Sequence, residues 1–114
     1  MLLFYDEDEL SACPDEAERA LAAELGAEGL RRIDASIVGS LKALGPGRWK
    51  VARVIADALH AGGFSYSDPN LDAVVNLHAR RVQGLVASGA LKYQGHLNKP
   101  RFCEVCLSEP KEIS

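Results

Sequence analysis

The sequence predicts a mainly α-helical domain that closes with a β-hairpin. Apolar residues recur at helical spacing in four stretches of the first 90 residues. Two short runs near the C-terminus instead have the composition of strands, and a turn-forming segment separates them. The chain of 114 residues is long enough for one hydrophobic core and leaves little room for a second.

The first expected helix covers residues 14–25. It follows an apolar start, Met1–Tyr5, that is either an edge strand or a hydrophobic plug. Pro14 suits the first helical position, where its missing N–H costs no hydrogen bond. Acidic residues follow it, as the positive end of the helix dipole favours. The apolar side consists of Ala17, Ala20, Leu21 and Leu25, and Gly26 is a typical stop.

The second expected helix covers residues 34–44. Asp34 is its candidate cap, and the breaker triplet at 45–47 ends it. The third expected helix covers about 48–61 and has the clearest helical period in the chain. Its apolar stripe consists of Val51, Val54, Ile55, Ala58 and Leu59. On the opposite side, Arg53 and Asp57 have the spacing of an i,i+4 ion pair.

A loop over residues 62–70 leads to a long fourth helix that Gly89 stops. Its apolar face consists of Leu71, Val74, Val75, His78, Val82, Leu85 and Val86. Because of this position we expect His78 to be a hydrogen-bonded core histidine. Residues 91–94 and 102–107 then form the two strands of the hairpin.

Three helices followed by a hairpin is the order of a winged-helix domain, here with an extra N-terminal helix. On this interpretation residues 31–107 form the winged-helix-like body. Residues 1–30 form an acidic arm with one helix that packs on the body, and residues 108–114 form a flexible tail.

Three stretches also carry a family resemblance: Arg48–Leu59, Ala79–Leu91 and Glu104–Leu107. Together they resemble a small bacterial domain of unknown function that often forms the C-terminal half of larger uncharacterised proteins. The similarity covers about residues 34–107; it supports the fold and provides no catalytic residues. Within the match we expect a structural ion pair between Arg81 and Glu104, with ligand binding as the alternative role of the two residues.

The net charge of −3 hides an uneven distribution. Residues 1–30 carry nine acids and one base, a net charge of −8, whereas residues 31–107 carry eleven bases and five acids, a net charge of +6. An acidic arm thus precedes a basic body. No apolar run exceeds the five residues Met1–Tyr5, so we expect no membrane span.

The patterns that could indicate catalysis fail on spacing. Cys103 and Cys106 form a C-x-x-C, but on a strand they face opposite sides about 10 Å apart, too far for a disulfide or a zinc knuckle. The serines lack a nucleophile-elbow motif, and Gly62-Gly63 lacks the P-loop pattern. We therefore expect no enzyme activity, no cofactor and no metal site. Strand cysteines and the lack of a signal-peptide pattern indicate the cytoplasm.

Protein binding is the favoured function, in a regulatory or neutralising role. Phe64, Tyr66 and Tyr93 are the candidate anchors, because aromatic side chains often dominate interfaces. Alternatively, they seal the ends of the small core. Self-association is a further option for a domain with separated charges. The long loop over residues 62–70 favours protein binding over DNA binding, because a DNA-reading helix-turn-helix joins its helices by about three to four residues.

The alternative function is that of a DNA-binding winged-helix regulator. The fourth helix would then enter the major groove, and the hairpin would follow the backbone. The candidate residues are Asn76, Arg80 and Gln83 for base edges and Lys92, Lys99 and Arg101 for phosphates. The acidic arm opposes this function unless it swings away or folds onto the basic body, where it would mimic nucleic acid.

Overall fold

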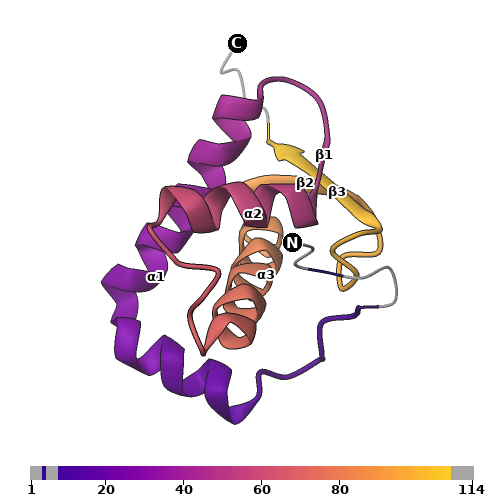
Figure 1. Cartoon of the computed structure of the whole chain (residues 1–114). Helices are drawn as coiled ribbons and strands as arrows, with labels where there is room; N and C mark the ends of the chain where they lie inside the picture. Colours follow the sequence, from indigo (N-terminus) through magenta and orange to yellow (C-terminus); the bar gives the residue numbers. More distant parts are fainter. Residues whose placement is uncertain (1–3, 5–7, 109–114) are drawn as a thin grey trace.

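The computed structural model describes Phe4 and residues 8–108 of the chain. Its elements are α1 (Glu16–Leu44), β1 (Trp49–Lys50), α2 (Val51–Ala61), α3 (Leu71–Ala87), β2 (Leu91–Gly95) and β3 (Cys103–Leu107). The described chain is therefore mainly helical, with a small antiparallel sheet that contains the expected hairpin (Figure 1). Apart from Phe4 and Ser108, the expected N-terminal strand or plug and the expected C-terminal tail lie outside the described residues.

α1 joins the first two expected helices into one element. Gly26, the expected stop, does interrupt the helix, with φ 68° and ψ −177°. Residues 27–33 were not expected to be helical, but the apolar stripe of the next segment extends back into them through Leu30 and Ile33. An exposed ion pair between Glu28 and Arg32 adds i,i+4 support there. Helical structure thus continues through the predicted gap.

The expected third helix begins later than its sequence pattern suggests. Trp49 and Lys50 form the short strand β1, and α2 starts only at Val51. β1 pairs with β3, with Trp49 opposite Val105 and Lys50 opposite Glu104. A two-residue strand has no period of its own, so helical periodicity alone assigned both residues to the helix.

The sheet has the strand order β1-β3-β2, and all its strands are antiparallel. Gly95 at the end of β2 has φ 100°, and a Cβ there would lie 2.2 Å from the Phe102 carbonyl oxygen. Glycine is therefore required where the hairpin begins to turn. The turn itself is tied to the helices, since the Ala52 N–H donates to the Pro100 carbonyl at 3.1 Å.

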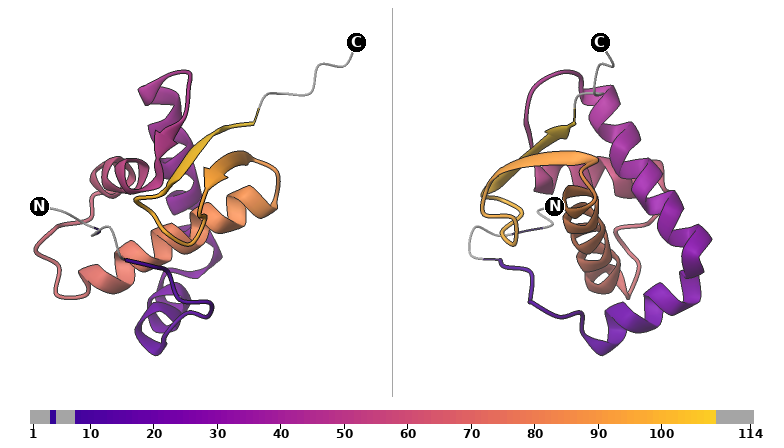
Figure 2. Two further views of the ribbon diagram at one scale, coloured as in Figure 1. Left: turned by 90° about the vertical axis from the view of Figure 1, so that its right-hand side faces the viewer. Right: turned by 180° about the vertical axis from the view of Figure 1, so that it is seen from behind.

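α3 lies inside the curve that α1 forms, and α2 crosses beside both (Figure 2). The core comes from one stripe of each helix and from the inner face of the sheet. Its fully buried members include Ile37, Val54, Ile55, Ala58, His78 and Val105. Phe4 and Leu10, which precede α1 in the sequence, belong to the same cluster.

The placement of the core predicts how stability responds to truncation. Ile55 is completely buried, so Ile55→Ala should lower the free energy of unfolding by about 2–5 kcal/mol through lost burial and a residual cavity. Lys50→Ala removes an exposed side chain and should cost under about 0.5 kcal/mol. Urea unfolding monitored by circular dichroism measures both. Equal small losses would show that the buried face of α2 is misplaced.

Candidate interaction surface

The N-terminal segment, residues 8–18, runs from the hairpin turn past α3 to the start of α1 and contacts both α3 and the turn (Figure 1). Its strongest contact is a two-pronged ion pair between Glu18 and Arg80. The Arg80 Nε donates to Glu18 Oε2 at 2.9 Å, and Nη2 donates to Oε1 at 3.1 Å. The remaining Arg80 nitrogen, Nη1, donates to the main-chain carbonyl of Ser11 at 2.6 Å. One arginine of α3 therefore binds two separate points of the segment.

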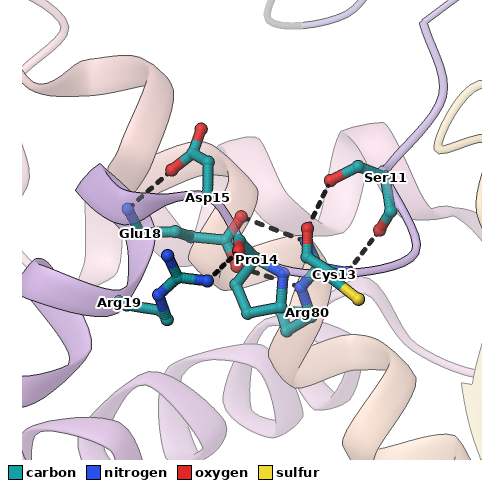
Figure 3. Close-up of polar contacts among 7 residues, drawn as sticks. All are labelled: Ser11, Cys13, Pro14, Asp15, Glu18, Arg19 and Arg80. Atoms are coloured by element: carbon teal, nitrogen blue, oxygen red, sulfur yellow. Dashed lines mark hydrogen bonds and ion pairs between the residues drawn. The ribbon is translucent and has the colours of Figure 1, made fainter.

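The start of α1 orients Glu18 toward Arg80 (Figure 3). Asp15 is the N-cap, and its Oδ1 accepts a hydrogen bond from the Glu18 N–H at 2.8 Å. Arg19 donates to the Pro14 carbonyl at 2.9 Å, which tightens the same turn. Glu18 thereby occupies the third helical position, on the side of α1 that faces α3. Its side chain is only 2% exposed, so the charge depends on Arg80 for compensation.

The other end of the segment is attached to the hairpin turn. The Leu10 N–H donates to the Asn98 carbonyl at 2.7 Å, and the Asn98 side-chain amide donates to the Glu9 carboxylate. Leu10 is buried, whereas Ser11 and Cys13, which follow it, are exposed. The segment thus runs from the hairpin turn to α3, with a bend at Ala12 and Cys13, and ends in the first turn of α1.

A cavity of about 320 Å³ lies between the segment, the start of α3 and the hairpin turn. Its walls include four carboxylates, those of Asp8, Glu9, Asp15 and Asp72. Asn76, a candidate for reading base edges, also lines it. The surface over the first half of α3 is therefore acidic, and acidic surfaces repel nucleic-acid phosphates.

The remaining candidates for DNA contact lie on different elements: α3, β2 and the hairpin turn. Arg80 is bound by the segment, and Gln83 is half-buried one turn further along the helix. Lys92 is exposed on β2, while Lys99 and Arg101 are half-buried in the hairpin turn.

Two basic residues that the sequence analysis missed lie near Lys92. The register places Lys50 and Gln94 on either side of Glu104, on the same sheet face as Lys92. The Arg48 guanidinium donates to the Gln94 side chain and so reaches this face as well. We call Arg48, Lys50 and Lys92 the basic sheet face. The sequence pattern does not reveal this face, because only the pairing of β1 with β3 brings Arg48 and Lys50 beside the hairpin.

The aromatic candidates divide into two groups. Phe64 is part of the folded core: its ring meets the His78 ring edge-on, with centroids 5.3 Å apart. Tyr66 and Tyr93 are 43% and 49% exposed, as binding anchors need to be. Phe102, which the sequence analysis did not select, is 47% exposed beside the hairpin. Tyr93 and Phe102 therefore give the hairpin two large uncovered aromatic side chains.

The ion partner of Arg81 is Asp34, not the expected Glu104. The Arg81 Nε and Nη2 donate to the two Asp34 oxygens at 2.8 and 2.6 Å, and this raises the pKa of Arg81. Asp34 was expected to cap a helix, but it lies inside α1 because helical structure continues before it. Its side chain is therefore free to tie α1 to α3, while Glu104 lies between Lys50 and Gln94 on the sheet.

Of the two cysteines of β3, Cys103 is poorly suited to nucleophilic chemistry. Cys103 is buried and Cys106 is half-buried, as opposite strand faces predict. Burial, reinforced by the nearby Glu104 charge, raises the pKa of the Cys103 thiol to about 11, so the thiol stays protonated near neutral pH. Among the described residues, no three His, Cys, Asp or Glu side chains gather as metal ligands would. Nor does any helix of that part of the chain have the length and hydropathy to cross a bilayer.

His78 is the buried core histidine that the sequence predicts. Its Nδ1 donates to the Val74 carbonyl at 2.8 Å, and its Nε2 is buried without a hydrogen-bond partner. Burial lowers the pKa of His78 below its ordinary value of 6.5, and the bond to Val74 opposes this shift only in part. The folded protein therefore holds His78 neutral.

Loss of the ion pair between Arg80 and Glu18, here called the Arg80 clamp, should destabilise the protein. Arg80→Ala leaves the Glu18 carboxylate buried without its cation, so the free energy of unfolding should fall by about 1–3 kcal/mol. Arg53→Ala is the matched control, because it breaks an exposed i,i+4 pair with Asp57 and should cost about 0–1 kcal/mol. Urea unfolding of the two variants makes the comparison. A loss at Arg80 no larger than at Arg53 would contradict a structural role for the clamp.

His78 makes stability depend on pH. Its folded pKa lies below its unfolded pKa, so unfolding takes up a proton below about pH 6.5, and stability falls as the pH is lowered. The decline should approach about 1.4 kcal/mol per pH unit at most, the limit for one proton. Urea unfolding between pH 7 and 5.5 measures it. His78→Gln should flatten the decline, whereas the exposed His60→Gln should not; an unchanged slope in His78→Gln would refute the assignment.

No family model, curated protein or solved structure matches this chain. What the surface binds must therefore follow from its own chemistry. Three features define that chemistry: the acidic N-terminal segment over α3, the basic sheet face, and the exposed aromatic side chains on the hairpin.

Proposed function

We propose that this chain is a non-catalytic, winged-helix-like module that binds another protein in a regulatory or neutralising role. The order of its elements from the second half of α1 onward, helix, strand, two helices and a hairpin, supports the winged-helix interpretation. The sheet order β1-β3-β2 supports it too. The resemblance of residues 34–107 to a small bacterial domain implies the same fold.

One observation carries the choice of a protein partner. α3 and the hairpin turn hold a peptide, the N-terminal segment, by contacts typical of peptide recognition. Arg80 and Asn98 bind main-chain groups, Arg80 also binds a carboxylate, and Leu10 fills an apolar seat. Among the described residues, this face of α3 offers a phosphate no uncovered cation, because Arg80 is occupied and the adjoining cavity is acidic.

The hairpin supplies the surface that a partner would meet first. Tyr93 and Phe102 are each about half exposed, and the basic sheet face lies on the other side of β2 from Tyr93. Aromatic and arginine side chains are common anchors of protein interfaces. The partner surface that fits is apolar with acidic residues around it, because opposite charges orient an encounter.

DNA binding is the second candidate function, and the basic sheet face favours it. Arg48, Lys50 and Lys92 could contact phosphates without involving α3. The connection between α2 and α3 weighs against the use of α3 itself. It covers residues 62–70, nine residues where about three to four are typical of a DNA-reading helix-turn-helix.

Photocrosslinking tests for a protein partner. A benzophenone amino acid in place of Tyr93 should form a discrete adduct with one protein in the cells that make this chain. The same amino acid in place of the exposed Ala23 of α1 is the control and should form none. Added wild-type protein should compete with the adduct, whereas the double variant Tyr93→Ala, Phe102→Ala should not. Absence of a competed adduct would overturn protein binding through the hairpin.

A salt series with mixed-sequence duplex DNA separates the two functions. Under the proposal, the protein binds DNA more weakly than about micromolar at low salt. Tighter binding with a steep negative salt slope would favour the DNA function instead. Lys92→Ala should then reduce that slope, since a phosphate contact releases counterions.

A further inference from the structure

We infer that the place of the N-terminal segment on α3 and the hairpin turn is a binding site for an acidic peptide segment of the partner protein. In the free protein, residues 8–18 occupy this site and block it. The inference rests on the proposed protein-binding function and specifies both the chemistry of the partner and its regulation.

The contacts of the segment define what the site recognises. Two of them use only main-chain groups of the segment: the Ser11 carbonyl accepts from the Arg80 guanidinium, and the Leu10 N–H donates to the Asn98 carbonyl, so neither depends on the side chains of the bound peptide. Selectivity comes from the two buried side chains, Leu10 and Glu18. A peptide with an apolar residue followed at the same span by a carboxylate can therefore make the same set of contacts.

Most of the segment lies at the surface: residues 11–13 and 15–17 are all exposed, although the Ser11 carbonyl binds Arg80. The segment also brings Glu9 and Asp15 into one cavity with Asp72, and like charges there repel one another. A contact that combines a strong clamp with charge repulsion is suited to exchange with a competitor that carries fewer acids.

Gly26 provides a point about which the blocking segment can move. Its non-helical backbone separates the first part of α1, residues 16–25, from the part that packs against α2. Glu18 lies before this break, whereas Asp34, which ties α1 to Arg81 of α3, lies after it. Release of Glu18 therefore leaves the second attachment of α1 in place.

The covalent link gives the segment an advantage over a peptide in solution. A tethered ligand acts at an effective concentration of about millimolar, so a separate peptide of the same sequence binds weakly to the wild-type protein. Weakening the internal clamp should reveal the site. Glu18→Gln does this with the least change of shape, because it keeps the side-chain volume and removes the charge.

The test uses the full chain and a fluorescent peptide of residues 8–19 with Cys13 replaced by serine. Fluorescence anisotropy should show at least about tenfold tighter binding to Glu18→Gln than to the wild type, the ratio expected when a charged hydrogen bond becomes a neutral one. Adding Arg80→Ala to that variant should abolish the gain. A control peptide that itself carries Glu18→Gln should bind weakly to all three proteins. Cooperative thermal unfolding verifies that each protein is folded.

A charge reversal keeps the inference falsifiable if Glu18→Gln has little effect on the clamp. Arg80→Glu repels the internal Glu18, and its site should accept the peptide that carries Glu18→Arg in preference to the original sequence. A merely structural role for Arg80 would produce no such switch.

Three results would overturn the inference. The opened variants could bind neither peptide, they could bind duplex DNA instead, or the Leu10 amide could exchange its hydrogen only by global unfolding. The last result would show that the segment is an integral part of the fold. Crosslinking from Tyr93 is independent of all three, so the general protein-binding function can survive the failure of this more specific inference.

Discussion

The buried carboxylate of Glu18 is the constraint on which the placement of the N-terminal segment and the start of α1 depends. An ion removed from water costs several kcal/mol unless a partner of opposite charge and good geometry compensates it. Arg80 supplies that compensation with two parallel hydrogen bonds. Because Glu18 can reach Arg80 only if α1 begins at Glu16, after the Asp15 cap, and curves around α3, the pair determines where the first turn of α1 lies.

A second ion pair, between Asp34 and Arg81, also attaches α1 to α3. Asp34 binds Arg81 with both oxygens, one residue away from Arg80 on α3. Adjacent arginines of one helix thus hold two points of α1, on opposite sides of the Gly26 break. Both pairs are only partly exposed, so they carry more specificity than an exposed pair such as Arg53–Asp57.

The sequence predicted the helical body and the hairpin well, because both have strong periods. The apolar stripe of α2 and the loop over 62–70 are placed as expected, and His78 is buried. β1 could not be predicted, since two residues show no period and pair with a strand more than fifty positions away. The partners of Arg80 and Arg81 were equally inaccessible. They depend on the path of α1 through residues 27–33, a segment that composition alone left without structure.

This path also changes the meaning of the net charge. A total of −3 combines an acidic N-terminal part with a basic body, and the structure shows where the two meet. The acids cover α3, whereas the basic sheet face stays uncovered. A nucleic acid that used α3 would have to displace Asp8, Glu9 and Asp15 and would still face Asp72 of α3, whereas an acidic peptide can supply its own carboxylate to Arg80. The carboxylates over α3 therefore disfavour a polyanion such as a nucleic acid much more than a short acidic peptide. This distinction depends on how the charges are grouped, not on the charge of any single residue.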